Sequence, residues 1–307
     1  MNYFAPRTAA ERYAKGRAYF HPLLIGRARE FLSLSEHLPR GLDVCCGTGL
    51  SSVALKEIAA RVVGVDGSAE MLAFAPKRSG IAFCLADAEN LPFGEGAFDI
   101  LSVCQALHWL DKRKFLAEAR RVLRAGGWLV VYDNYMTGRM VENEDFQPWF
   151  KETYMGRFPA PPRDWVSFAP GEPESEGFHL RLDVRFENAI SFSPAGLIDF
   201  VTTHSNVIAA VEGGSEDINE VRAWLFESVR PFFGGRGEAR FVFEAALWCL
   251  QRASSETSRT NDKTGNSHRD TEAQRLRQGL KDELKKLSFI LLLCACGVSV
   301  ASSVWRS

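Results

Sequence analysis

The sequence has 307 residues, 46% hydrophobic and 24% charged, the balance of an ordinary globular protein with enough apolar material for a sizeable core. The formal net charge of -1 and the lack of a basic stripe in residues 1–250 argue against nucleic acid as a partner. An odd count of seven cysteines without framework spacing, and an N-terminus without an uninterrupted apolar stretch, favour a cytoplasmic protein with reduced thiols.

Strand and helix patterns alternate along the chain as far as about residue 250. This alternation predicts an α/β fold with a doubly wound, mostly parallel sheet of seven strands. The expected strands cover residues 42–46, 61–66, 81–85, 98–104, 128–132, about 180–192 and about 240–250. Helices are expected at 51–60, at 68–75 with Ser68 as N-cap, and after Asp111, where an apolar face runs up to Gly126 and Gly127.

Three acidic residues stand at the carboxyl ends of the first three expected strands, namely Asp43, Asp66 and Asp87. A glycine loop, Gly47-Thr48-Gly49, follows the first strand, where it lets a ligand approach the backbone and the free amides of the next helix. Asp66 follows Gly47 by 19 residues, the spacing at which an acid can accept hydrogen bonds from a ribose diol. Because ligands of open α/β sheets bind at this edge, the pattern predicts a ribose-containing cofactor.

Two other interpretations of these residues stay open at this point. The acids can be solvated loop residues at strand ends, without a ligand. Alternatively, residues 47–52 approximate the G-x-G-x-x-[GA] pattern of a nicotinamide-dependent reductase. The reductase is the weaker alternative, because an acid four residues before Gly47 is not part of that pattern and Asp87 would have no role.

The motifs of the first three strands together resemble a known family. They read Leu42-Asp43-Val44-Cys45-Cys46-Gly47-Thr48-Gly49, then Val63-Gly64-Val65-Asp66, then Ala86-Asp87-Ala88-Glu89-Asn90-Leu91-Pro92-Phe93. They are similar to the class I S-adenosylmethionine-dependent methyltransferases of the small "methyltransferase type 11" group, over about residues 8–135. The resemblance implies a Rossmann-like fold, S-adenosyl-L-methionine as cofactor and methyl transfer as activity.

By this likeness, Asp43 and the loop after it hold the methionine part of the cofactor, Asp66 the ribose, and Asp87 with Ala88 the adenine. The implied cofactor contacts also include Cys45, Cys46, Gly47, Thr48, Gly49, Gly67, Met71 and Gln105. Cys45 stands where these families usually carry the first glycine, so we expect altered cofactor affinity rather than lost binding. This departure also leaves a second class of function open, a cofactor-binding scaffold without catalysis.

The tip of the fourth strand should meet the acceptor of the methyl group, and there the sequence reads Gln105-Ala106-Leu107-His108-Trp109. It lacks the Asn/Asp-Pro-Pro-aromatic motif with which amide and base methylases grip a planar nitrogen. It resembles the "HW" subgroup, which includes trans-aconitate methyltransferase-like proteins acting on small carboxylic acids. A small-molecule acceptor methylated at an oxygen, either carboxylate or hydroxyl, is the expectation that follows.

The segment from Tyr13 to Tyr19 resembles the Tyr-x3-Arg-Pro-x-Tyr segment of the same subgroup, with Ala18 in place of the proline. In the family that segment covers the site, so the resemblance implies substrate contacts by Tyr13, Arg17 and Trp109. His108 is the expected catalytic residue, as a base or as a hydrogen-bond donor to an acceptor carboxylate; the alternative is a packing histidine. The aromatic segment 146–165 is either a wall of the acceptor pocket or part of the core.

Composition predicts the domain organisation. Together with the resemblance, it predicts a methyltransferase domain over residues 1–252, with a cofactor half at about 38–135, an acceptor-binding part at about 136–252 and an N-terminal lid at 8–25. Residues 253–275 read as a disordered polar linker. Residues 276–307 hold a charged segment and the charge-free run 287–305, a candidate transmembrane helix whose alternative is a buried or dimer-forming helix. No zinc-like cysteine spacing occurs, so no metal is expected, and the oligomeric state stays open.

Overall fold

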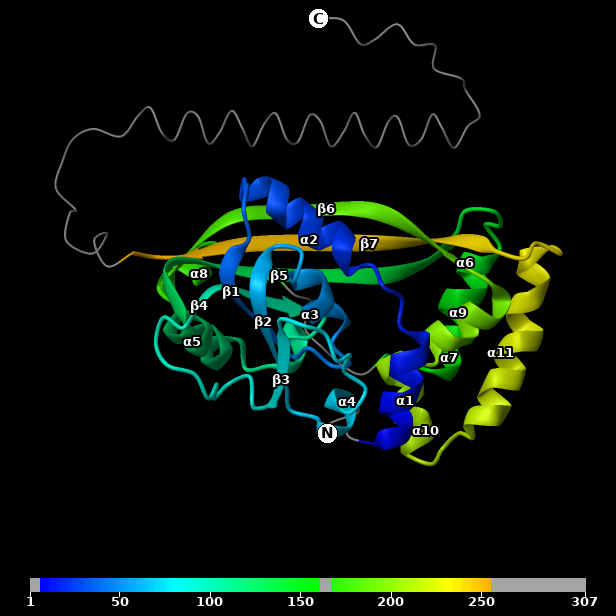
Figure 1. Ribbon diagram of the computed structural model, residues 1–307. Coiled ribbons are helices and arrows are strands. Elements are labelled where there is room, and N and C mark those ends of the chain that lie inside the picture. The colour runs from blue at the N-terminus through cyan, green and yellow to red at the C-terminus, as the bar shows by residue number, and fades with distance from the viewer. Residues whose placement is uncertain (1–5, 161–166, 255–307) are drawn as a thin grey trace, which may run out of the picture. The chain divides into compact units, whose positions relative to one another are not determined.

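The computed structural model describes residues 6–160 and 167–254. Its centre is one sheet of seven strands in the order β3-β2-β1-β4-β5-β7-β6 (Figure 1). The strands are β1 (Leu38–Val44), β2 (Ala59–Asp66), β3 (Ile81–Leu85), β4 (Phe98–Cys104), β5 (Leu123–Met140), β6 (Phe178–Phe192) and β7 (Ala239–Arg252). Strands β1 to β5 pair in parallel, whereas β7 is antiparallel to both β5 and β6. The predicted α/β fold with a mostly parallel sheet is confirmed.

Helices pack on both faces of the sheet, and a further group of helices lies at the far ends of the long strands β5 and β7 (Figure 1). The α-helices are α1 (Arg7–Gly16), α2 (His21–Phe31), α3 (Leu50–Leu55), α4 (Ala69–Leu72), α5 (Lys112–Val122), α6 (Phe146–Pro148), α7 (Met155–Arg157), α8 (Glu172–Ser175), α9 (Pro194–Val201), α10 (Ser205–Glu212) and α11 (Ile218–Phe233). A 3₁₀ turn η1 (Leu107–Trp109) follows β4, and a π-helical segment η2 (Trp149–Tyr154) joins α6 to α7.

Three hydrophobic clusters hold these layers together. The first lies between α5 and one face of the sheet, and the second lies between α2, α3 and the opposite face. The third is built from α9, α11 and the far ends of β5 and β7, with many aromatic rings. Phe146, Phe150, Tyr154 and Phe158 are all buried in this third cluster, so residues 146–158 of the aromatic segment belong to the core, whereas residues 161–165 lie outside the described residues.

Several element boundaries differ from those expected. Helix α4 ends at Leu72 instead of residue 75, shortly before Pro76, because a proline disfavours helical conformation in the residue that precedes it. Helix α5 ends at Val122, and the Gly126-Gly127 pair lies inside β5. Strand β5 is 18 residues long and thus far exceeds the expected 128–132, because it pairs with β7 along most of its length.

The C-terminal part of the chain was expected to include a candidate membrane span. In the described ranges 6–160 and 167–254, the structure contains no helix that is both long enough and apolar enough to cross a bilayer. The candidate span 287–305, the charged segment before it, and the expected linker from residue 255 onward lie outside the described residues.

Candidate cofactor and acceptor site

The carboxyl ends of β1, β2 and β4 meet beside helix α1, which belongs to the expected lid, at one edge of the sheet. A cavity of about 20 Å³ lies there, lined by Tyr13, His21, Cys45, Cys46, Thr48, Leu50, Ser51 and Cys104. Four of these residues were expected to contact the cofactor or its acceptor, and they come from α1 and from the loop after β1. The fold therefore brings Tyr13, an expected acceptor contact, next to the expected cofactor contacts Cys45, Cys46 and Thr48.

Asp43 lies beneath this edge as a fully buried carboxylate. It accepts hydrogen bonds from the hydroxyls of Ser51 and Ser52, each at 2.6 Å, and of Ser102 at 2.8 Å. Burial raises its pKa to about 6, although the three hydroxyls act in the opposite direction. Asp43 thus ties the start of α3, and with it the glycine loop, to β1 and β4.

The raised pKa of Asp43 has a consequence for stability. The folded state binds this proton more tightly than the unfolded chain does, so Asp43 should lower the unfolding free energy by about 3 kcal/mol as pH rises from 4 to above 6. The difference between wild type and Asp43→Asn, from urea unfolding at several pH values, should follow this curve. A difference that does not vary with pH would contradict it.

Backbone conformation in the loop after β1 is unusual. Cys45, Gly47 and Gly49 all have positive φ, at 56°, 55° and 82°. A Cβ at Gly49 would lie 2.8 Å from the Phe83 ring, so only glycine fits there. Cys45 occupies the left-handed region without being glycine, although glycine adopts this backbone conformation most readily.

We expect Cys45→Val to destabilise the fold by about 2 kcal/mol, because a β-branched side chain is strongly disfavoured at positive φ. Cys45→Gly, the matched control, relieves the same strain and should change the unfolding free energy by less than about 1 kcal/mol. Thermal unfolding of both variants tests this difference. Equal stability of the two variants would show that the backbone at Cys45 is not strained.

Asp66 ends β2 and reaches both the glycine loop and the start of α4. Its carboxylate accepts the backbone N–H of Gly47 at 2.8 Å and that of Ser68 at 2.9 Å, one on each oxygen. Burial raises the pKa of Asp66, and these two amides partly oppose the rise. Each oxygen of the Asp66 carboxylate keeps capacity for another donor.

Two other expected cofactor contacts differ in their exposure. Met71 is buried, with its Cε 3.1 Å from where a Cβ on Gly47 would stand, whereas Gly67 is exposed.

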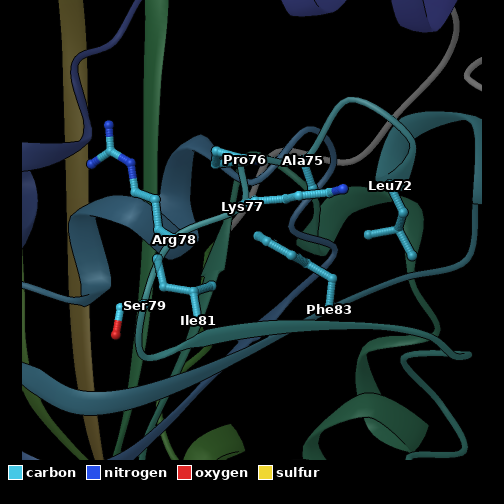
Figure 2. A pocket seen from close by; sticks show the side chains of 8 residues that line it. All are labelled: Leu72, Ala75, Pro76, Lys77, Arg78, Ser79, Ile81 and Phe83. Atoms are coloured by element: carbon cyan, nitrogen blue, oxygen red, sulfur yellow. The ribbon is translucent and has the colours of Figure 1, made fainter.

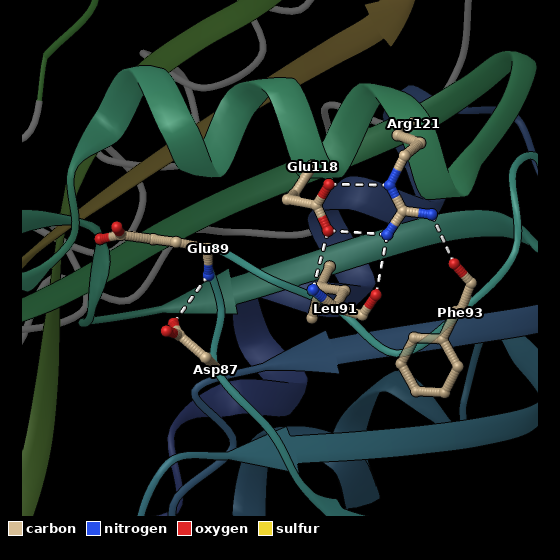
Figure 3. A network of polar contacts seen from close by, with 6 residues as sticks. All are labelled: Asp87, Glu89, Leu91, Phe93, Glu118 and Arg121. Atoms are coloured by element: carbon tan, nitrogen blue, oxygen red, sulfur yellow. Dashed lines mark hydrogen bonds and ion pairs between the residues drawn. The ribbon is translucent and has the colours of Figure 1, made fainter.

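The loop after β3 carries Asp87 and Ala88. Asp87 is exposed and accepts the N–H of Glu89, whereas Ala88 is buried. Figure 3 shows how α5 fixes this loop: Arg121 donates to the carbonyls of Leu91 and Phe93, and also pairs with Glu118 at 2.7 Å. Glu118 in turn accepts the N–H of Leu91. Helix α5 thus positions the expected adenine contacts through its Glu118–Arg121 pair.

Helix α1, in the expected lid, is anchored on α9 and α10. Arg12 pairs with Glu212 at 2.6 Å, and a Cβ on Gly16 would stand only 2.1 Å from the Asp199 carbonyl oxygen. Tyr13 points to the glycine loop, with its Cε1 3.9 Å from where a Cβ on Gly47 would stand. Burial raises the pKa of Tyr13, so its phenol is protonated.

Gln105 follows β4 with a φ of 51°, another left-handed residue that is not glycine. Its Oε1 accepts a hydrogen bond from Arg17 at 2.5 Å, and its Nε2 donates to the Asn134 carbonyl at 2.7 Å. Such strain gathers at functional sites when the surrounding structure fixes it. The structure therefore joins Arg17 to the tip of β4, a link that the sequence analysis did not predict.

His108 and Trp109 lie in η1, a few residues after Gln105. Their rings are 4.7 Å apart, and Trp109 is 38% exposed. His108 is more buried than Trp109. They share the end of β4 with Gln105, which is the position that the sequence assigned to them.

Sequence reasoning missed His21, Asn134 and the serines that hold Asp43. His21 is buried beside the small cavity, with Nδ1 3.2 Å from the Tyr132 hydroxyl, and burial lowers its pKa to about 3, so its imidazole is neutral. Its only sequence signal was a histidine-proline pair at the start of a helix. Asn134 had none, because it lies in the part of β5 that extends past the expected strand.

A larger hollow of about 540 Å³ lies along β3 and the connection from α4 (Figure 2). It is lined by Leu72, Ala75, Pro76, Lys77, Arg78, Ser79, Ile81 and Phe83, none of which is an expected site residue. Phe83 and Pro76 close it off from Gly49, whose missing Cβ they approach. The hollow is therefore separate from the glycine-loop edge.

Comparison with known proteins agrees with this geometry. Residues 42–131 match a family described as "Methyltransferase domain". An uncharacterized methyltransferase of Mycobacterium tuberculosis is 32% identical over 209 residues, 66% of this chain and 77% of the relative. The O-methyltransferase cnsE of Penicillium expansum is 40% identical over 107 residues, which are 32% of this chain and 38% of that protein.

A solved structure, described as that of a type II methyltransferase from Anaeromyxobacter dehalogenans, shares the fold. Its TM-score is 0.58 at 21% identity, and the match covers 75% of this chain and 97% of that one. Fold, matched domain and the Mycobacterium relative agree. The chain belongs to the class I S-adenosylmethionine-dependent methyltransferases, in the type 11 group.

Proposed function

We propose that the protein transfers a methyl group from S-adenosyl-L-methionine to an oxygen of a small molecule. The observation that carries the proposal is the edge formed by the glycine loop, Asp66 and the lid. Gly47 has a positive φ and no Cβ, so a ligand can approach its backbone closely, whereas the missing Cβ of Gly49 makes room for the Phe83 ring. Asp66 beside them keeps acceptor capacity for a ribose diol.

The other cofactor contacts follow from this placement. Cys45, Cys46 and Thr48 would hold the methionine part together with the glycines, and Asp43 supports them from below through its three serines. Gly67 and Met71 would border the ribose and adenine, with Asp87 and Ala88 on the far side. Gln105 completes the site at β4.

Bound S-adenosyl-L-methionine would supply an electrophilic methyl carbon, which bonds to the acceptor oxygen as the carbon–sulfur bond breaks and the sulfur keeps the electron pair. The chain has to orient the acceptor and exclude water. Tyr13, Arg17 and Trp109 are the proposed acceptor contacts. His108 would remove the proton of a hydroxyl acceptor, or donate a hydrogen bond to a carboxylate acceptor, which needs no base.

An oxygen nucleophile is supported by the relative from Penicillium expansum, which is named an O-methyltransferase. The experiment is transfer of labelled methyl from S-adenosyl-L-methionine into a metabolite extract, followed by identification of the labelled product. An oxygen-methylated small molecule is expected.

Isothermal titration separates this proposal from its alternatives. Binding of S-adenosyl-L-methionine without any labelled product would favour a scaffold. Binding of NADH without S-adenosyl-L-methionine binding would favour a reductase. Either result would refute methyl transfer.

A further inference from the structure

The sheet ends on one side in the long strand β6, which has β7 as its neighbour on the inner side (Figure 1). It has 15 residues, whereas strands in globular proteins average about 5–6. Within the described residues, no backbone hydrogen bond joins the outer side of β6 to another part of the chain. An edge of this kind is a template on which another strand can pair.

Most features that protect an edge strand from such pairing are missing from β6. Protected edge strands are short, carry Lys or Pro, or contain bulges that twist the edge away. Strand β6 contains neither Lys nor Pro, and its register against β7 shifts between Leu180 and Leu182. From Leu182 to Phe192 the pairing with β7 runs without a shift, so this stretch has a regular outer edge.

Charges of alternating sign follow one another on one face of this stretch. Asp183, Arg185 and Glu187 are all exposed, and they point to the same face because side chains alternate along a strand. Arg185 pairs with Glu244 of β7 at 3.4 Å, and Glu187 pairs with Arg139 of β5. Each of these four paired side chains is at least 42% exposed. Arg185 and Glu187 therefore keep capacity for a further charged partner.

The opposite face of the same stretch is apolar. Phe186 and Ile190 pack against the hydrophobic cluster beneath α2 but are only partly buried. The Arg27 guanidinium of α2 lies 4.2 Å from the centre of the Phe186 ring. Leu23 lies one helical turn before Arg27, hence on the same side of α2, and it is 40% exposed. Apolar surface is thus left exposed beside the free edge of the sheet.

We propose that two copies of the chain pair through their β6 strands, antiparallel about a two-fold axis at Phe186, so that the two sheets become one. In such a pairing the residue on the axis faces its own copy, and the residues before it face those after it. Arg185 of each copy then faces Glu187 of the other. On the apolar face, Leu182 faces Ile190 and the two Phe186 rings meet, so both faces of the strand are self-complementary.

Charge excludes most other registers. With the axis at Asp183, Arg185 or Glu187, that residue would face its own copy, and like charges directly opposite each other are unfavourable. An axis beyond Glu187 brings no opposite charges together. Within the range 183–187, only Val184 and Phe186 stand between two residues of opposite charge.

The regularity of β6 decides between these two positions. An axis at Val184 leaves a regular ladder over residues 182–186, because the register shift after Leu180 interrupts the strand there. An axis at Phe186 uses the whole range 182–190, which is almost twice as long. Strands β5 and β7 separate β6 from β4 and from the cofactor edge, so each copy keeps its own cofactor site in this pairing.

The test measures the mass of the full chain by sedimentation velocity at increasing concentration. Wild type should pass from monomer to dimer as its concentration rises to about 100 µM. Arg185→Glu and Glu187→Arg should each weaken the dimer by about tenfold or more, because like charges then face each other across the axis. The two variants mixed in equal amounts should form a heterodimer about as stable as the wild-type dimer, since every glutamate again faces an arginine.

The controls separate the interface from the fold. Arg61→Glu is a matched charge reversal of an exposed residue on β2, far from β6 in the strand order, and should leave the dimer unchanged. The melting temperature of each variant shows that it is folded. S-adenosylhomocysteine should bind equally to wild type and to Arg185→Glu, because β6 contributes nothing to the cofactor edge.

Three results would overturn the proposal. A wild-type chain that stays monomeric up to about 100 µM would mean that solvent, or residues 255–307 of the same chain, occupy the edge. A dimer that either single variant leaves intact would use another surface or another register. An equal mixture of the two variants that stays monomeric would exclude the pairing of Arg185 with Glu187.

Discussion

Replacing Asp66 by alanine should raise the dissociation constant for S-adenosylhomocysteine by about 10²-fold, equivalent to roughly 3 kcal/mol. A ribose diol on this edge would lose a charged acceptor that the two backbone amides hold in place. Burial has already raised the pKa of this carboxylate, so the cost of desolvating it is carried by the fold before the ligand arrives. Isothermal titration near neutral pH measures the effect.

The control for this prediction separates the ligand contact from the support of the loop. Asp66→Asn keeps one acceptor oxygen and the size of the side chain, so it should fall between wild type and alanine in affinity. Asp66→Ala also frees the amides of Gly47 and Ser68, so the melting temperature of each variant is needed to show that the site is folded. An unchanged dissociation constant in a folded Asp66→Ala variant would show that Asp66 does not bind the ribose.

The strands around the cofactor edge were predictable because each is short, apolar and bounded by turn residues. Residues 81–85 and 98–104 have the bounds that their patterns gave. The glycine loop and Asp66 were equally predictable. A positive φ and a close approach to the backbone favour glycine, and the βαβ unit fixes the spacing between the loop and Asp66. Cys45 is the exception: its φ is positive but the residue is not glycine, so the sequence does not indicate its backbone conformation.

The acceptor side was far less predictable. Asn134 depends on how far β5 extends beyond β4, and this length is set by pairing with β7 more than a hundred residues later in the chain. The link from Arg17 through Gln105 to Asn134 joins three elements whose contacts have no local signature. The sequence pattern of the aromatic residues 146–158 is the same whether they line a pocket or fill the core, and only their packing against α9 and α11 shows that they belong to the core.

His108→Ala should lower turnover by about 10²-fold or more while leaving the affinity for S-adenosylhomocysteine nearly unchanged. The reason is its place in η1 directly after Gln105, at the carboxyl edge of β4, where an acceptor aligned with the cofactor would lie. The alternative is a packing role against Trp109, whose ring lies 4.7 Å from the imidazole. Single-turnover transfer of labelled methyl, normalised to folded protein, measures the effect.

Two further variants distinguish what His108 does. If it removes a proton from a hydroxyl acceptor, His108→Gln should be as slow as His108→Ala, and added imidazole should restore part of the rate to the alanine variant. If it donates a hydrogen bond to a carboxylate acceptor, His108→Gln should retain much of the rate, because its amide also donates, and imidazole should have little effect. Trp109→Leu removes the ring contact but keeps the imidazole; because Trp109 is also a proposed acceptor contact, its melting temperature and not its turnover reports the packing. Full turnover per folded molecule in His108→Ala, together with a lowered melting temperature, would leave His108 with only a packing role.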